Sequence, residues 1–225
     1  GELHGEHDLY GHEFCVYDPL INVPLLVKHP DLDADRREDQ VELLDLYHTV
    51  LDVLDVSGEA ADGAVPLDPT RSLVADDYRA FDGLADADRD PGQRGDGEYA
   101  FVEYSRPVVE LTQLEEKATG AGIDLPKESR FYSRMRAARR VDAKYVRIDR
   151  IDDEAFRLDT DPGEIDNLAG GDDPAIGQTE AVLSAFESAA GGAWTDALDD
   201  DVSDDAVEEM DDEAQERLRD LGYLE

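Results

Sequence analysis

The chain has 225 residues, enough for one large domain or for one domain with a small companion. Asp and Glu total 58 against 21 Lys and Arg, and the resulting net charge of −37 argues strongly against nucleic acid or an anionic membrane as a partner. The hydrophobic share of 40% still suffices for a core, which excludes wholesale disorder.

The surplus of acidic residues predicts a salt-adapted protein. Repulsion at this charge density opposes compaction in dilute buffer, and molar salt screens it within about 3 Å. Only four of the basic residues are Lys, and a surface rich in acid and poor in Lys is typical of a protein bathed in concentrated salt. An ordinary acidic protein with an acidic tail is the alternative.

Targeting signals and disulfides are not evident in the sequence. There is no run of about 18 apolar residues and no basic-then-apolar leader. The chain has no initiator Met, and we expect it to continue upstream of Gly1. The single Cys15 has no partner for an internal disulfide. Localisation therefore stays open, with a soluble cytoplasmic protein slightly favoured, and so does the oligomeric state.

The first half of the chain alternates loops with two regular segments. Residues 1–18 are polar and glycine-punctuated, which predicts a loop. Residues 21–27 are predicted to be extended and to form a short buried strand, with Pro24 at an edge or at the start because proline lacks an N–H donor. Apolar residues at helical spacing predict a helix over residues 38–55, stopped by Gly58, and residues 57–98 are predicted as a surface loop or domain joint.

The second half predicts a small antiparallel sheet with helices. Apolar residues alternate in four short segments joined by tight connections, with a short helix over residues 108–118 before the second strand. Asp173-Pro174 is predicted to start a helix that covers the sheet through Ile176, Leu183, Phe186 and Ala190. An acidic, solvated stretch and a last helix over residues 204–221 follow. The four predicted strands are residues 99–104, 133–141, 144–148 and 155–159.

Imidazoles and carboxylates cluster in the N-terminal loop and could bind a transition metal or calcium. Their spacing matches no standard zinc pattern, so a solvated or hydrogen-bonded loop is the favoured interpretation. The cluster consists of Glu2, His4, Glu6, His7, Asp8 and His12.

Two further features could carry chemistry. Cys15 lies between Phe14 and Val16 and is predicted to be an inert buried thiol, because a reactive cysteine needs an exposed, electropositive setting. A basic group near the second strand could bind an anion, but in so acidic a chain we expect its members to pair with surrounding carboxylates. This group consists of Arg130, Arg134, Arg136, Arg139 and Arg140.

The order of several separated segments resembles the sulfatases of the alkaline-phosphatase superfamily. Gly-Glu-His-Asp-Leu-Tyr-Gly-His at residues 5–12, Tyr-Asp-Pro at 17–19 and Val-Pro-Leu-Leu-Val at 23–27 are similar to the stretch that follows the family's Asp-His-Gly metal motif. Val41-Glu-Leu-Leu-Asp-Leu is similar to its next helix, and Arg71-Ser-Leu resembles a Gly-x-Ser-Leu loop without the glycine. The late segments that match are Lys144-Tyr-Val-Arg, Phe156-Arg-Leu-Asp-Thr-Asp-Pro-Gly-Glu-Ile-Asp-Asn-Leu-Ala and Leu218-Arg-Asp-Leu-Gly-Tyr-Leu.

The resemblance implies an α/β fold in two parts. Residues 1–90 would end an alkaline-phosphatase-like α/β/α catalytic domain, and residues 91–225 would form a C-terminal subdomain with an antiparallel four-stranded sheet and helices. The implied activity is sulfuric ester hydrolysis, with a sulfate ester as substrate. The alternatives are a phosphonate or phosphodiester hydrolase of the same superfamily, or a non-catalytic anion-binding module that uses the basic strand.

The resemblance also implies cofactors that this chain does not supply. A divalent cation, Ca²⁺ first, would be held by an Asp and a His or Asn upstream of Gly1. The nucleophile would be a formylglycine made from Cys or Ser in Cys/Ser-x-Pro-x-Arg, and Cys15 departs from that motif because Val-Tyr-Asp follows it. We therefore expect no catalytic or metal-binding residue here and no activity of the chain alone.

Two histidines are the substrate-binding positions that the resemblance implies. A Lys that contacts sulfate in many family members aligns within one residue with His12, which could donate a hydrogen bond to a sulfate oxygen or protonate the leaving oxygen. His7 is the second position, and we expect it to shape the loop rather than touch the substrate.

Overall fold

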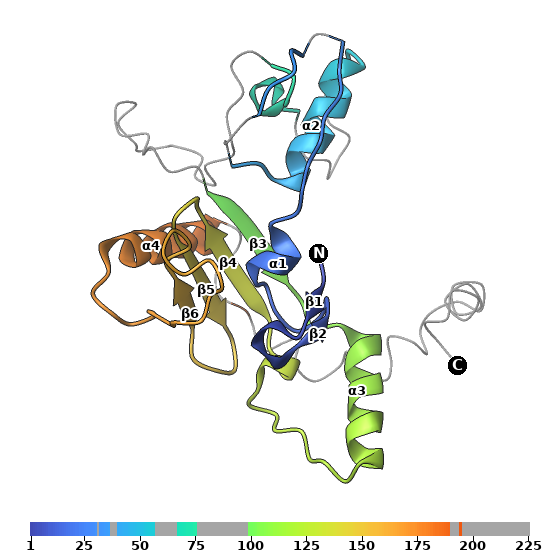
Figure 1. Cartoon of the computed structure of the whole chain (residues 1–225), viewed down its shortest axis with the longest axis vertical. Helices are drawn as coiled ribbons and strands as arrows, with labels where there is room; N and C mark the ends of the chain where they lie inside the picture. Colours follow the sequence, from blue (N-terminus) through green and yellow to red (C-terminus); the bar gives the residue numbers. More distant parts are fainter. Residues whose placement is uncertain (31, 37–39, 57–66, 76–98, 190–193, 195–225) are drawn as a thin grey trace, which may run out of the picture.

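A four-stranded antiparallel sheet forms the centre of the protein (Figure 1). The computed structural model describes residues 1–30, 32–36, 40–56, 67–75, 99–189 and 194. The strands lie side by side in chain order, which confirms the predicted meander. They are β3 (Ala100–Tyr104), β4 (Met135–Arg139), β5 (Lys144–Ile148) and β6 (Glu154–Phe156).

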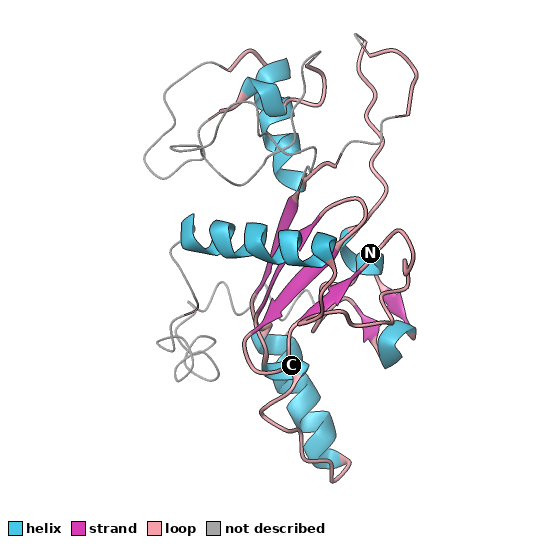
Figure 2. Cartoon of the chain, turned by 90° about the vertical axis from the view of Figure 1, so that its left-hand side faces the viewer, coloured by secondary structure: helices cyan, strands magenta, loops and turns pink. Residues whose placement is uncertain are grey.

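One face of the sheet is covered by α4 (Pro174–Ala189), as Figure 2 shows. Asp173 begins this helix because its Oδ1 accepts hydrogen bonds from the N–H groups of Ala175 (2.9 Å) and Ile176 (3.2 Å). The predicted apolar stripe is confirmed, since Ile176 and Leu183 are buried against the sheet residues Ala138, Tyr145 and Ala155.

The opposite face is covered by the N-terminal segment. Alternation along β4 and β5 points Met135, Ala137, Val146 and Ile148 away from α4, and Val16 joins them in one buried apolar cluster. The segment continues into the short helix α1 (Asp18–Ile21). Before it, β1 (Leu3–His4) and β2 (Tyr10–Gly11) pair around the 3₁₀ turn η1 (Glu6–Asp8). The sheet is thus the middle of three layers.

The predicted helix between the first two strands is confirmed as α3 (Val108–Gly120). Gly122, at a φ of +72°, ends it with a left-handed residue. Figure 1 shows α3 projecting from the sheet. Its side-chain anchor is Glu115, which accepts hydrogen bonds from Tyr132 (2.5 Å) and Lys127 (2.9 Å).

The predicted helix over residues 38–55 is confirmed as α2 (Leu43–Val53). A buried ion pair joins it to η2 (Pro69–Arg71), because Arg71 Nε donates to Asp45 Oδ1 at 2.7 Å. Glu42 bonds Arg71 as well and accepts the Phe101 N–H at 2.7 Å, which links α2 to the first sheet strand.

The predicted strand over residues 21–27 is wrong. Ile21 ends α1, and residues 22–29 form neither helix nor strand. An extended segment becomes a strand only when a neighbour accepts its backbone hydrogen bonds, and within the described ranges no strand lies beside it. Its apolar side chains are exposed instead, Leu26 at 91%. Gly58, most of residues 57–98, Ala190 and the predicted helix 204–221 lie outside the described residues.

Packing between α4 and the sheet should dominate the stability of this unit. Leu183 is fully buried, so Leu183→Ala should lower the free energy of unfolding by about 2–5 kcal/mol through lost burial and a cavity. Val141→Ala, at an exposed position, should change it by less than about 0.5 kcal/mol. Denaturant unfolding in molar KCl measures both variants, and equal effects would contradict this assignment of the core.

Candidate ligand-binding loop

The loop formed by residues 5–18 carries both predicted substrate-binding histidines. Its backbone is tightly turned, with left-handed φ values at Gly5 (120°) and Gly11 (89°), where a side chain would be strained. His7 and Asp8 also adopt left-handed conformations, at 55° and 58°. Such strain persists only where the surrounding structure fixes the backbone.

His7 lies flat on Tyr17. The ring centroids are 3.6 Å apart and the planes differ by 9°. Burial lowers the pKa of His7, and the positive charge of Arg130 lowers it further. His7 is therefore a neutral, stacked imidazole near pH 7.

Tyr17 is itself held from below by Arg130. The guanidinium lies 5.1 Å from the Tyr17 ring centroid and donates to the Tyr17 hydroxyl at 2.8 Å. The same group donates to Glu154 at 2.5 Å, which keeps Arg130 paired with a carboxylate. Burial raises the pKa of the Tyr17 hydroxyl, so it stays protonated.

His12 has a different environment from His7. Its side chain is 69% exposed, and Nε2 lies 3.2 Å from Glu13 Oε1. The second oxygen of Glu13 accepts the His12 backbone N–H at 3.1 Å. His12 is therefore accessible to a ligand from solvent, whereas one face of His7 is covered by Tyr17. The structure gives the two rings separate partners.

Two acidic side chains of the loop, Glu6 and Glu13, accept hydrogen bonds from its backbone. Glu6 Oε2 accepts the His4 N–H at 2.6 Å, and this bond is the main reason that the pKa of Glu6 is lowered. Within the part of the chain that the structure describes, no three His, Cys, Asp or Glu side chains converge to hold a metal ion. Glu6 is engaged in a hydrogen bond within the loop itself.

Cys15 is buried under the loop, as predicted, with 2% of its surface exposed. Burial raises the pKa of its thiol, which keeps it protonated and unreactive. It packs with Leu3, Tyr17, Phe156 and Leu158. The loop therefore stands on a small apolar core of its own.

Ionic contacts, not anticipated from the sequence, fix residues 16–18 to the sheet. Lys144 on β5 is fully buried and donates to the Val16 carbonyl and to Asp18 Oδ1, both at 3.0 Å. It also forms an ion pair with Glu164. Arg139 also donates to Asp18, from Nε to Oδ1 at 3.0 Å and from Nη2 to Oδ2 at 2.8 Å. The alternation of β5 was the available signal, because it puts residues 144, 146 and 148 on one buried face.

The turn at residues 161–169 is fixed by the side chains of Asp161 and Asn167. Asp161 Oδ2 accepts the N–H groups of Ile165 (2.8 Å) and Asp166 (2.9 Å). Asn167 accepts the Ala155 N–H at 2.9 Å and donates to the Asp153 carbonyl at 3.0 Å, which fixes the turn beside β6. The pattern Asp-Pro-x-Glu-x-x-Asn thus encodes a rigid turn that carries Glu164.

Comparison with known proteins found no relative of this chain. No family model, curated protein or solved structure matches the chain. None of the helices in the described ranges is long and apolar enough to cross a bilayer.

Members of the predicted basic group pair with carboxylates, as expected. Arg134 Nε donates to Asp149 at 2.7 Å, and Arg136 Nε donates to Glu103 at 2.8 Å. Arg130, Arg139 and Arg140 pair with Glu154, Asp18 and Asp142 respectively. The basic strand is therefore neutralised from within the fold.

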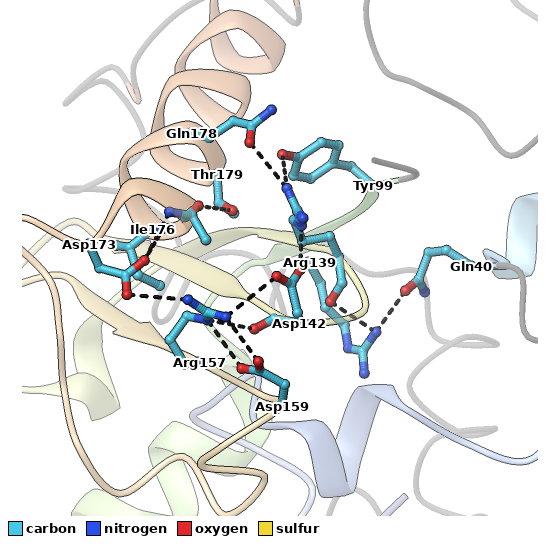
Figure 3. A network of polar contacts seen from close by, with 12 residues as sticks. Gln40, Tyr99, Arg139, Asp142, Arg157, Asp159, Asp173, Ile176, Gln178 and Thr179 are labelled. Carbon is cyan, nitrogen blue, oxygen red and sulfur yellow. Dashed lines mark hydrogen bonds and ion pairs between the residues drawn. The ribbon is translucent and has the colours of Figure 1, made fainter. Parts of the chain in front are cut away.

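A second ionic network stands at the turn between β4 and β5 (Figure 3). Arg157 donates to Asp159 at 2.9 Å and to Asp173, the residue that caps α4, at 3.3 Å. Its Nη2 also lies 3.7 Å from Asp142 in the turn. The arginine fastens the start of α4 to the sheet and leaves these carboxylates partnered.

The stacked His7 should make stability depend on pH. Because its folded-state pKa lies below its ordinary value of 6.5, the unfolded chain binds more protons as the pH falls through this range. The contribution of neutral His7 is fully present above pH 6.5 and is lost as the pH falls towards the lowered pKa.

His7→Phe tests this dependence, because Phe keeps an aromatic ring and removes the titration. The loss of unfolding free energy between about pH 7.5 and about pH 5 should be smaller in the variant than in the wild type. Denaturant unfolding in molar KCl measures it. His48, whose pKa is also lowered by burial, is present in both proteins and cancels. Identical pH dependence in the two would contradict the protonation cost assigned to His7.

Proposed function

We propose that the chain is the C-terminal part of a sulfuric ester hydrolase and that residues 5–18 form one wall of its sulfate-ester site. The observation that supports the proposal is the packing of three family-like segments that are far apart in the sequence. Asp18, Lys144 and Glu164 belong to the segments 17–19, 144–147 and 156–169, and their side chains meet in one buried cluster. Residues that match a family at scattered positions and also meet in space are more informative than the matches alone.

The exposed apolar side chains of residues 25–27 and of α2 also support the proposal. Leu25, Leu26 and Val27 are exposed, as are Leu43 and Val50 on α2. An extended segment followed by an amphipathic helix is the kind of unit that packs into a larger α/β layer. Under the proposal, the upstream part of the catalytic domain covers this surface.

The chemistry that this chain could contribute is binding and orientation. His12 is exposed, and its imidazole can donate a hydrogen bond to an oxygen of a bound sulfate ester or protonate the leaving alcohol oxygen. Glu13 Oε1, 3.2 Å from Nε2, orients the ring. His7 and Tyr17 fix the backbone on which His12 stands. The nucleophile and the cation would come from upstream residues.

The rival functions differ in what they require. A phosphonate or phosphodiester hydrolase would share this wall, and the residue at the nucleophile position separates the two: Cys or Ser in x-Pro-x-Arg favours sulfate esters, and Thr favours phosphoryl transfer. The anion-binding module on the basic strand is disfavoured, because Arg134 and Arg136 are paired with Asp149 and Glu103.

The isolated chain should not hydrolyse an aryl sulfate. Residues 1–225 lack the Cys/Ser-x-Pro-x-Arg motif, and their described part has no cation site. Purified protein in molar KCl, incubated with 4-nitrophenyl sulfate and Ca²⁺, should release no nitrophenol above the buffer rate. Turnover by this chain alone would refute the proposal, and so would an upstream coding sequence without Asp followed by His or Asn.

In the protein extended by its upstream coding sequence, His12→Ala should lower kcat/KM for the aryl sulfate by roughly 10- to 100-fold, the worth of one charge-assisted hydrogen bond. His4→Ala is the matched control, since His4 is an exposed histidine on the neighbouring strand β1. It should leave kcat/KM unchanged. Equal values for wild type and His12→Ala would exclude His12 from the site.

A further inference from the structure

Lys144 is an unusual residue for the middle of a core. Its side chain has no exposed surface, yet its ammonium faces three oxygens: the Val16 carbonyl, Asp18 Oδ1 and Glu164 Oε1. A buried ammonium is tolerated only when its donors are met in this way. Two of its three partners belong to residues 16–18, so the lysine grips that segment from the sheet.

Glu164 holds the same segment from a second direction. It is 2% exposed, and its Oε2 accepts the Asp18 N–H at 2.6 Å. Its backbone is left-handed, with a φ of 56°, in the turn fixed by Asp161. Burial raises the pKa of Glu164, and the charge of Lys144 opposes this. A non-glycine residue in a left-handed conformation indicates that the turn is shaped to deliver this carboxylate.

We propose that Lys144 and Glu164 are positioning residues, which hold residues 16–18 on the sheet and thereby set the place of the loop that carries His7 and His12. The anchoring itself needs no assumption about activity, and its consequence for ligand binding rests on the proposed function.

The route from the anchor to the histidines is short. Val16 and Asp18, the anchored residues, flank Tyr17, whose ring supports His7 at 3.6 Å. On the other side, the Phe14 N–H donates to the Tyr104 hydroxyl at 2.7 Å, two residues after His12. Displacement of residues 16–18 would therefore remove the surface on which His7 rests and shift the base of the segment that carries His12.

Cys15 reports on this anchor without any assay of activity. It is the only cysteine in the chain. It is buried between Phe14, whose N–H donates to Tyr104, and Val16, whose carbonyl accepts from Lys144. A thiol reagent can react with it only when the segment lifts from the sheet, so the labelling rate measures local opening. The amide exchange of Leu183 in α4 measures opening of the main core in the same sample.

The decisive variant is Lys144→Met with Glu164→Met. Replacing both partners removes one charge of each sign and leaves Asp18 paired with Arg139, so the variant should keep a cooperative unfolding transition. The Val16 carbonyl and the Asp18 N–H lose their side-chain partners. Labelling of Cys15 should accelerate at least about tenfold, while exchange at Leu183 stays slow. Glu164→Gln alone should accelerate it in the same direction.

The matched control is Lys127→Met, which removes a lysine from an exposed ion pair with Glu115 and should leave the Cys15 rate at the wild-type value. Wild-type labelling in the double variant would overturn the proposal. Equal acceleration of Cys15 labelling and Leu183 exchange would overturn it too, since Lys144 and Glu164 would then stabilise the whole fold.

In the extended enzyme, the double variant should raise KM for the aryl sulfate more than it lowers kcat. Acceleration of labelling without that change would keep the anchor and count against the proposed function of the loop.

Discussion

The ion cluster of Lys144, Glu164, Asp18 and Arg139 is the constraint on which the rest of the structure depends. Moving each charge out of water costs several kcal/mol, and attraction offsets that cost only with good geometry and satisfied hydrogen bonds. Here two cations meet two anions, and the remaining donors are also satisfied: Lys144 donates to the Val16 carbonyl and Arg139 Nη1 donates to Gln40 Oε1. Since the anions come from residues 18 and 164 and the cations from the sheet, the cluster can form only when all three segments are in place. The N-terminal segment that covers this face of the sheet is therefore required for the cluster to form.

Pairing of buried charges with carboxylates also explains the arginines of the sheet. Some of the acidic residues therefore stabilise the fold directly. Arg136 and Arg147 lie directly opposite each other on β4 and β5, an arrangement that is unfavourable for like charges. Glu187 of α4 resolves it by pairing with both. Cross-strand repulsion is thus turned into a contact between helix and sheet. Some of the 58 acidic side chains are neutralised in such internal pairs, while the net charge of −37 that remains needs screening by salt.

Periodicity predicted the regular part of this fold because that part buries a single stripe or face. The strands β3 to β5, the helices α2 and α4, and the Asp173 cap follow directly from apolar spacing and capping chemistry. Burial of Cys15 and pairing of the basic group were also predictable, from apolar neighbours and from the excess of acid. The prediction of a strand at residues 21–27 was wrong because a strand needs a neighbouring strand to pair with. Within the described residues, no strand lies beside this segment. The Lys144 cluster was beyond reach, because pairing of residues 18, 144 and 164 depends on long-range topology.

The loop gives its two histidines and its cysteine three different environments. One histidine is stacked and neutral, the other is exposed and oriented by Glu13, and the nearby thiol is buried and protonated. Under the proposed function, this loop would orient an anionic ester, and the nucleophile would come from upstream residues. A site of this kind gains from rigidity, because an orienting group misplaced by 1 Å loses most of its effect. The costly buried ions beneath the loop are then explained by the precision that they give to residues a few positions away.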